Sequence, residues 1–193
     1  ACTAPPLRTP SLVGAPPALE RLVARSVADL NALRLAERAD PSRFFVAAGA
    51  PWYLTLFGRD SLLTARLFLA ADPTLAVATL RTLAARQGRV VDADRAEAPG
   101  KILHEVRAEA LDLTGGIVLP PEYYGTIDAT ALWVCLLGEA WRAGVDDATI
   151  ASFMDPLLAA LVWLDEHADA DGDGFVEYYD ESGHGLANQG WKD

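Results

Sequence analysis

Residues 60–88, DSLLTARLFLAADPTLAVATLRTLAARQG, predict two helices joined by a tight turn. Apolar residues recur at three- and four-residue spacing on both sides of Asp72-Pro73, which is the pattern of helices with one buried face. Asp is a preferred N-cap residue and Pro is favoured in a first helical turn, so the second helix is expected to begin there. Gly88 follows its last turn as a stop signal. The stretch therefore predicts a helical hairpin.

Three further segments carry the same helical periodicity, at residues 18–36, 128–142 and 146–167. Alternation typical of a strand is weak throughout the chain. Only residues 44–48 and 116–119 approach it, and both runs are short. We therefore predict an all-α fold.

The long segments between these helices end alike. Aromatic residues and glycine precede a final aspartate in WYLTLFGRD (52–60), YYGTID (123–128) and QGWKD (189–193), and these aspartates are 68 and 65 residues apart. A repeat of that period, with two antiparallel helices in each unit, indicates a solenoid or a closed ring of helical hairpins. A ring of six hairpins needs about twice this length, so residues 18–193 are expected to form its first half.

Composition restricts the function. The chain has 193 residues, a formal net charge of −11, 51% hydrophobic residues and 22% charged residues. That much apolar sequence excludes a disordered protein. The acidic balance argues against a nucleic-acid partner, and no apolar run approaches the roughly 18 residues of a membrane span. Neutral or cationic ligands fit this composition better.

The termini and the cysteines add two expectations. Residues 1–17 contain five of the twelve prolines and are predicted to form a Pro-rich linker. Cys2 and Cys135 do not form a disulfide framework, and Cys135 is expected to be a buried helical residue. A cytoplasmic location is expected, because so few cysteines suit a reducing compartment.

Four stretches resemble the motifs of bacterial glycogen-debranching-type glucosidases, the amylo-alpha-1,6-glucosidase family. They are AAGAPWYLTLFGRDSL (47–62), GKILHEVR (100–107), GTIDAT (125–130) and NQGWKD (188–193). They occur in the order of that family, and the resemblance covers nearly the whole chain from Leu19 onward. It implies an (α/α)6 barrel, usually behind a β-rich domain, that hydrolyses α-glucosidic bonds with inversion.

The same resemblance implies roles for individual residues. It makes Asp193 the catalytic general acid, and it makes Arg59 and Asp60 the pair that grips the nonreducing glucose. The catalytic base would be a glutamate in the second half of the barrel, so these 193 residues alone are expected to be inactive. The predicted sugar-binding residues are Trp52, Phe57, Arg59, Asp60, His104, Glu105, Tyr124, Asp128, Gln189, Trp191 and Lys192. No organic cofactor is expected, and the expected partners are an oligo- or polysaccharide and the remainder of the same polypeptide.

Most of these residues also have a structural interpretation. Asp128 and Asp193 fit helix N-caps, and Arg59 and Asp60 fit a solvated helix start. His104 and Glu105 fit a solvated loop, whereas the aromatic residues fit the core. The alternatives for the whole protein are a trehalase-, glucoamylase- or mannosylglycerate-hydrolase-like activity, or a noncatalytic carbohydrate-binding toroid.

One acidic loop resembles a calcium site. DADGDGFVEYYD (169–180) matches the calcium-loop pattern at positions one, three and five with Asp169, Asp171 and Asp173, and has glycine at position six. Position twelve is Asp180 instead of the usual glutamate. The alternatives are a bound Ca²⁺ and a plain turn rich in Asp and Gly.

Overall fold

The computed structural model describes residues 5–37, 40–113, 117–169, 171–177 and 189–190. Its helices are α1 (Pro17–Ala32), α2 (Gly58–Phe68), α3 (Thr74–Ala84), α4 (Ala129–Arg142), α5 (Asp147–Ala151) and α6 (Met154–Glu166). Its strands are β1 (Arg34–Ala36), β2 (Phe44–Val46), β3 (Glu105–Val106), β4 (Leu111–Leu113), β5 (Ile117–Leu119) and β6 (Glu122–Tyr123).

The prediction of an all-α fold is wrong. Among the described residues 42% are helical and 11% lie in strands, so the structure is mixed α/β. Three two-stranded antiparallel sheets pair β1 with β2, β3 with β6 and β4 with β5. Two of these strands overlap the short runs at 44–48 and 116–119, but the others form from segments without strand alternation. An all-helical (α/α)6 architecture therefore does not describe this chain.

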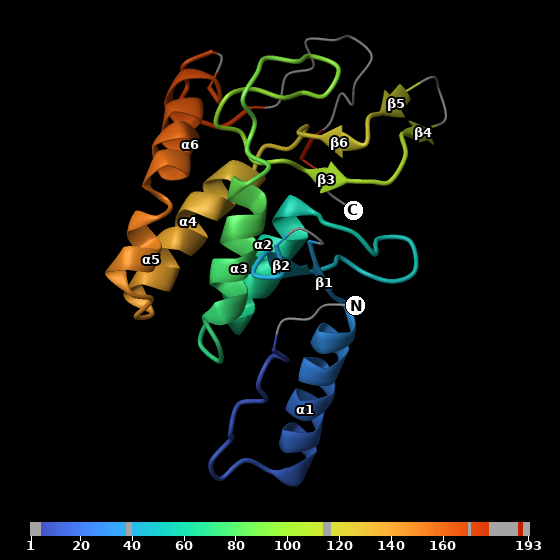
Figure 1. Ribbon diagram of the computed structural model, residues 1–193, viewed down its shortest axis with the longest axis vertical. Coiled ribbons are helices and arrows are strands. Elements are labelled where there is room, and N and C mark those ends of the chain that lie inside the picture. The colour runs from blue at the N-terminus through green and yellow to red at the C-terminus, as the bar shows by residue number, and fades with distance from the viewer. Residues whose placement is uncertain (1–4, 38–39, 114–116, 170, 178–188, 191–193) are drawn as a thin grey trace.

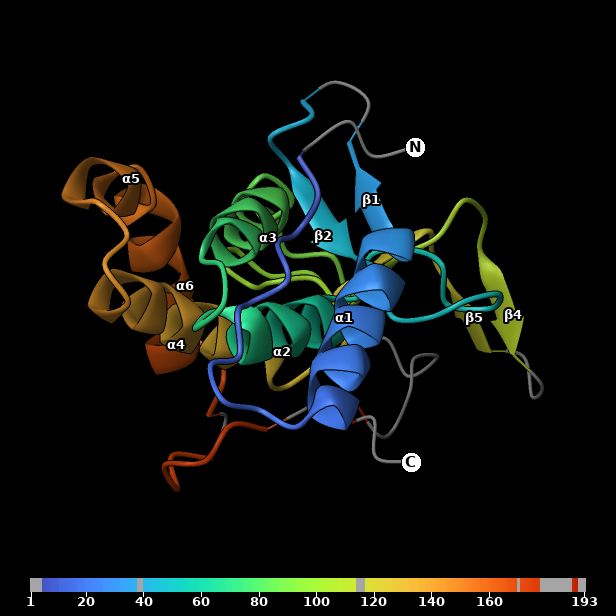
Figure 2. The ribbon, with the colours of Figure 1, turned by 90° about the horizontal axis from the view of Figure 1, so that it is seen from below.

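Helices α2, α3 and α4 pack together at the centre, and their apolar faces form the core (Figure 1). Trp133 on α4 is fully buried, and its indole Nε1 donates a hydrogen bond to the carbonyl of Leu80 on α3 at 3.1 Å. Helix α6 packs on α4, and the β1–β2 hairpin packs on α2 and α3. Figures 1 and 2 both place α5 and α6 at one side of this group and the β4–β5 hairpin at the other.

The first helix is shorter than predicted and lies outside the central group. Residues 34–36, expected to continue it, instead form β1, with Arg34 opposite Val46 and Ala36 opposite Phe44. Val27 is the buried residue of α1, which projects from the body of the molecule in Figure 1. The described part of the predicted linker packs beside this helix, since the backbone N–H of Leu7 donates to Asn31 Oδ1 at 2.8 Å.

The predicted fifth helix is divided into α5 and α6. Pro156 occupies the first turn of α6, where its missing N–H costs nothing. A continuous helix would set the proline ring against the carbonyl of Ser152, four residues earlier. The chain turns at Ser152 and Phe153 instead.

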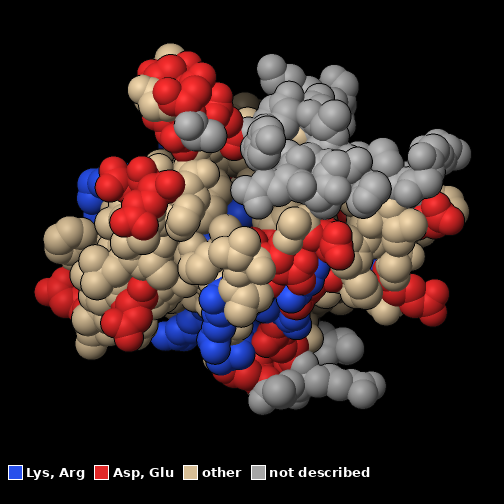
Figure 3. Space-filling view, turned by 90° about the horizontal axis from the view of Figure 1, so that it is seen from above, with Lys and Arg blue, Asp and Glu red and all other residues tan. Residues whose placement is uncertain are grey.

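A series of ion pairs connects the residues that follow α3 with three segments that lie elsewhere in the chain. Arg86 contacts Glu37 at 2.9 Å and Glu122 at 2.5 Å, and Arg95 contacts Glu122 at 2.9 Å and Glu97 at 2.8 Å. In Figure 3 basic and acidic side chains lie next to one another on the face seen from above. Among the described residues, none of the helices combines the length and the apolar character needed to cross a bilayer.

Candidate functional site

Arg59 connects the three loop endings that share the aromatic, glycine and aspartate pattern. Its Nε donates to Asp128 Oδ2 at 2.5 Å, and its Nη2 donates to the carbonyl of Gly190 at 2.7 Å. These partners are 69 and 131 residues away along the chain. The side chains of Arg59 and Asp128 are 21% and 33% exposed, so this pair is open to solvent and to a ligand.

The first turn of α2 holds Arg59 in place by close backbone packing. The N–H of Gly58 donates to the carbonyl of His104 at 2.7 Å. A Cβ at Gly58 would lie 2.2 Å from the carbonyl oxygen of Leu103, so no larger residue fits there without movement. The glycine therefore lets α2 begin directly against the segment that contains His104 and Glu105.

Asp128 stands at the N-cap position of α4, but its side chain makes no cap hydrogen bond. Its carboxylate instead receives Arg59 on Oδ2, and the hydroxyl of Thr126 donates to Oδ1 at 2.9 Å. Both oxygens therefore accept hydrogen bonds from side chains and none from the backbone N–H groups of α4. Asp128 therefore occupies the N-cap position that was predicted as the alternative, but its carboxylate does not cap the helix.

His104 and Glu105 are buried, so the interpretation as a solvated loop pair is wrong. The imidazole of His104 lies edge-on to Phe57 and Tyr123, with ring centroids 5.5 and 6.3 Å apart. Burial first, and then the positive charges of Arg59 and Arg107, lower the pKa of His104 to about 3. The His104 side chain near Arg59 is therefore uncharged at physiological pH.

Glu105 forms an ion pair with Arg107. The sequence analysis did not include Arg107 among the site residues. Its Nη2 lies 2.7 Å from Glu105 Oε2, and its guanidinium stands over the Phe57 ring at 5.7 Å from the centroid. The sequence offered a signal for Arg107, because it is the last residue of the GKILHEVR motif that carries the resemblance. The ion pair and the ring contact together hold Glu105, Arg107 and Phe57 against one another.

The predicted aromatic residues divide into two groups. Trp52 is 80% exposed, and the neighbouring Tyr53 is also exposed. Phe57 and Tyr124 are buried, so neither offers a ring face to a ligand, and both act as structural supports. The Tyr124 hydroxyl donates to the carbonyl of Arg86 at 2.7 Å, and burial raises the pKa of Tyr124 to about 12.

The loop that carries Trp52 is held at its base. Gly49 and Tyr53 exchange backbone hydrogen bonds of 3.1 and 2.9 Å. The hydroxyl of Thr55 donates to the carbonyl of Val106 at 2.5 Å, and the Tyr53 ring packs edge-on to Phe57 at 5.8 Å. Trp52 is thus an exposed ring on an anchored loop.

The remaining predicted residues are Asp60, Gln189 and residues 191–193. Asp60 is exposed and follows Arg59 in the first turn of α2. Gln189 is buried, and its Nε2 has no hydrogen-bond partner among the residues that the structure describes. Trp191, Lys192 and Asp193 lie outside the described residues.

Three acidic residues at the end of α6 could hold a metal ion. Carboxylate oxygens of Asp169, Asp171 and Glu177 lie within 4.8 Å of one another. This set differs from the predicted one, because Glu177 takes the place expected for Asp173. The Asp173 carboxylate accepts a hydrogen bond from the N–H of Phe175 at 2.9 Å. Asp180 lies outside the described residues.

A comparison with protein-family models finds none that matches the chain, and a search of curated proteins finds no matching relative.

Proposed function

We propose that this chain carries the glucose-gripping part of a glycoside hydrolase that acts on α-glucosidic bonds, with α-1,6 branches of glycogen-type glucans as its substrate. The observation that carries the proposal is the contact of Arg59 with Asp128 and Gly190. It sets a guanidinium and a carboxylate side by side at a partly exposed position, on segments far apart in sequence.

The chemistry of this pair suits a sugar. Neighbouring hydroxyls of a pyranose act as donors and acceptors at once, so they pair with a carboxylate and a guanidinium through charge-assisted hydrogen bonds. Trp52 supplies an exposed ring of the kind on which the apolar face of a pyranose stacks. The imidazole of His104 is uncharged, so the charged groups of the proposed site are Arg59, Asp60 and Asp128.

Asp193 is the proposed general acid, on the resemblance alone. Inversion requires a second carboxylate roughly 6.5–9.5 Å away, with the attacking water between the two groups. The resemblance assigns that base to a later segment of the polypeptide. Binding is therefore the first property to measure on this chain.

The binding test uses calorimetric titration with maltotriose and with phosphorylase limit dextrin. Asp128→Asn keeps the shape of the side chain and removes its charge. We expect affinity to fall at least about tenfold, because a hydrogen bond to a charged group contributes about 1.5–3 kcal/mol. Asp94→Asn, at an exposed aspartate on another loop, serves as the matched control and should bind as the wild type does.

The hydrolysis test measures glucose release from limit dextrin by the full natural polypeptide. Asp193→Asn should lower the rate at least about 100-fold, the scale of general acid catalysis. Release from trehalose, maltose or mannosylglycerate instead of limit dextrin would assign one of the alternative activities. Sugar binding without hydrolysis of any of these would identify a noncatalytic carbohydrate-binding module.

For the acidic loop, we propose Ca²⁺ as the ligand of Asp169, Asp171 and Glu177. Oxygen-only donor sets are those that Ca²⁺ prefers. The N–H groups of Gly172 and Gly174 donate to Asp169 at 2.8 Å and hold the loop curled around its carboxylate. Calorimetric titration should show Ca²⁺ binding that is lost in Asp171→Asn and kept in the exposed control Asp165→Asn. Equal binding by both variants would exclude this site.

We also propose a cytoplasmic location. Cys135 is an exposed free thiol, not the buried residue predicted from the sequence, and an exposed thiol is best preserved in a reducing compartment.

A further inference from the structure

The segment before α1 is held in place by side chains that bind its backbone. Figures 1 and 2 show this segment running alongside α1 in the opposite direction. The N–H of Leu7 donates to Asn31 Oδ1 at 2.8 Å, and Asn31 Nδ2 donates to the carbonyl of Leu7 at 3.1 Å. Arg34 Nη1 donates to the carbonyl of Pro5 at 2.6 Å. Three hydrogen bonds thus hold a stretch of backbone that lies outside the described helices and strands.

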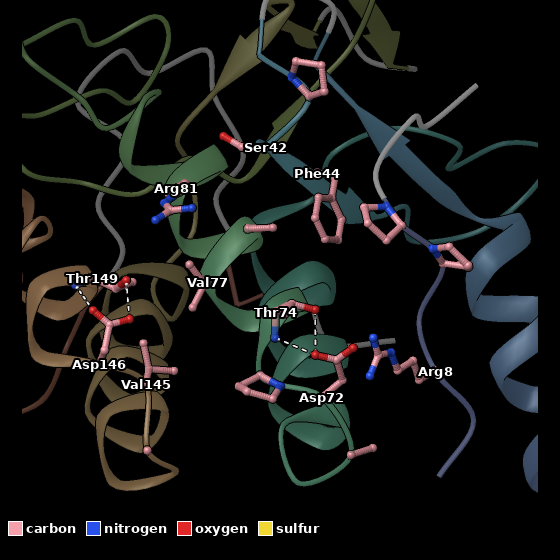
Figure 4. A pocket seen from close by; sticks show the side chains of 17 residues that line it. Arg8, Ser42, Phe44, Asp72, Thr74, Val77, Arg81, Val145, Asp146 and Thr149 are labelled. Atoms are coloured by element: carbon pink, nitrogen blue, oxygen red, sulfur yellow. Dashed lines mark hydrogen bonds between the residues drawn. The ribbon is translucent and has the colours of Figure 1, made fainter.

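Leu7 is the side chain that this arrangement buries. Among residues 5–16 it alone is buried, and the others are half-buried or exposed. It belongs to the same buried cluster as Val27 of α1 and Phe44 of β2. Figure 4 shows the segment passing between Phe44 and α1, with the Arg8 side chain directed away from the helix. Main-chain hydrogen bonds combined with a pocket for one side chain are the means by which recognition domains hold extended peptides.

The attachment of this segment is local, whereas the residues that bind it are fixed independently. Residues 8–16 form no helix or strand, so ordering them costs conformational entropy that one leucine and three hydrogen bonds must offset. Segments of this kind open without unfolding of the whole protein. Arg34 lies in β1 opposite Val46, and Asn31 lies in the last turn of α1. The binding residues therefore stay in place when the segment leaves.

We propose that the last turn of α1 and the start of β1 form a receptor site for an extended Pro-Pro-Leu segment of a partner protein, and that residues 5–7 occupy this site as an intramolecular ligand. Pro6 favours extended backbone at the residue before it, so such a segment loses little entropy on binding. Asn31 binds the backbone of the leucine, and the apolar pocket selects its side chain. None of the residues of the proposed sugar site takes part.

The experiment measures fluorescence anisotropy of a labelled peptide, PPLRTP (residues 5–10), with the 193-residue protein. Leu7→Lys in the protein should release its own segment, because an ammonium would be buried beside Arg34. We expect this variant to bind the peptide, and the wild type to bind it at least about tenfold more weakly, since the attached segment competes at high effective concentration. No binding by Leu7→Lys, or equal binding by both proteins, would overturn the proposal.

Two matched variants test the contacts themselves. Leu22→Lys changes an exposed leucine of α1 and should bind the peptide as weakly as the wild type does. Adding Asn31→Ala to Leu7→Lys should weaken peptide binding at least about tenfold, because both hydrogen bonds to the leucine backbone are lost. An unchanged affinity in this double variant would contradict the assigned site. Circular dichroism of each variant verifies that the helices remain folded.

Amide hydrogen exchange tests the unaltered chain, and so does not depend on the folding of a variant. The N–H of Leu7 should exchange at least about tenfold faster than that of Trp133 in the core, because it is released by local opening. Excess unlabelled PPLRTP peptide should accelerate the exchange at Leu7 by displacing the attached segment. A Leu7 N–H that exchanges as slowly as that of Trp133, with or without peptide, would show that the segment does not leave its site.

Discussion

Arg59 donates hydrogen bonds in different directions from one side chain, among them one through Nε to Asp128 and one through Nη2 to Gly190. A lysine ammonium is a single point of charge and cannot reproduce this fork. The lengths of these contacts, 2.5 and 2.7 Å, are those of charge-assisted hydrogen bonds. These contacts therefore depend on the shape of the guanidinium as well as on its charge.

We predict that Arg59→Lys lowers the free energy of unfolding by about 1 kcal/mol, because the pair is partly exposed and solvent weakens its contribution. At this chain length that corresponds to about 2–4 °C in melting temperature. Thermal unfolding measures the change, with Arg25→Lys as control, since Arg25 pairs with Asp29 on the open surface of α1. An unchanged melting temperature in Arg59→Lys would contradict the structural role of the fork.

His104 makes the folded state sensitive to acid. Its pKa falls from 6.5 to about 3 on folding, mainly by burial. Between these values the unfolded chain binds a proton that the folded protein does not bind. Stability is therefore complete above pH 6.5 and decreases as the pH falls toward 3, by up to about 1.4 kcal/mol for each pH unit.

We expect His104→Asn to reduce this dependence on pH, since asparagine does not titrate. Urea unfolding between pH 6.5 and 4 gives the slope for the wild type and the variant. His167→Asn, at an exposed histidine beyond α6, is the control and should retain the wild-type slope. If His104→Asn kept the full slope, the acid sensitivity would belong to other groups.

At the scale of elements, the junction between α2 and the segment after Lys101 depends on Gly58. Alanine normally favours a helix over glycine by about 1 kcal/mol. Here a Cβ would meet the Leu103 carbonyl at 2.2 Å, so backbone has to move. We predict that Gly58→Ala destabilises the protein by about 1–3 kcal/mol, as overpacking does.

Gly138→Ala is the matched control for this prediction. Gly138 lies inside α4, and an added Cβ there meets only the Arg142 side chain, at 3.6 Å. This substitution should stabilise the protein by about 0.5–1 kcal/mol through helix propensity. Urea denaturation of both variants should give changes of opposite sign, and the same sign in both would contradict the steric argument.

The helices were predictable because their signals are local. Periodicity, Asp72-Pro73 and Gly88 place α2 and α3 within a few residues of their observed limits. Strands were less predictable because their partners lie elsewhere in the chain. β3 forms only where Glu105 faces Tyr123, and β1 forms only where Arg34 faces Val46.

The same distinction applies to the candidate site. The repeated loop endings indicated which segments belong together, but not that Arg59 would pair with Asp128 instead of capping or extending into solvent. Nor did the sequence indicate that Glu105 would be buried against Arg107, because burial depends on how β3 and β6 meet. Local residue types indicated which segments contribute to the candidate site, whereas the pairing of its side chains depends on tertiary packing.

At the scale of the whole molecule, α6 presents an apolar surface on the side away from α4. Met154, Leu158, Leu161 and Val162 are 43–56% exposed and follow one another at helical spacing. A helix that is apolar all round is normally covered on every side. Exposed apolar patches of this kind mark contact surfaces between proteins.

We therefore predict that the 193-residue chain self-associates through α6 in a concentration-dependent way. Leu158→Glu/Leu161→Glu places two charges in the centre of the patch and should shift the mean mass toward the monomer, because burying an unpaired carboxylate is costly. Val118→Glu changes an equally exposed apolar residue on β5 and should leave the mass distribution unchanged. Sedimentation velocity over a hundredfold range of concentration measures both variants, and a wild-type chain that stays monomeric throughout would show that the α6 surface needs no covering partner.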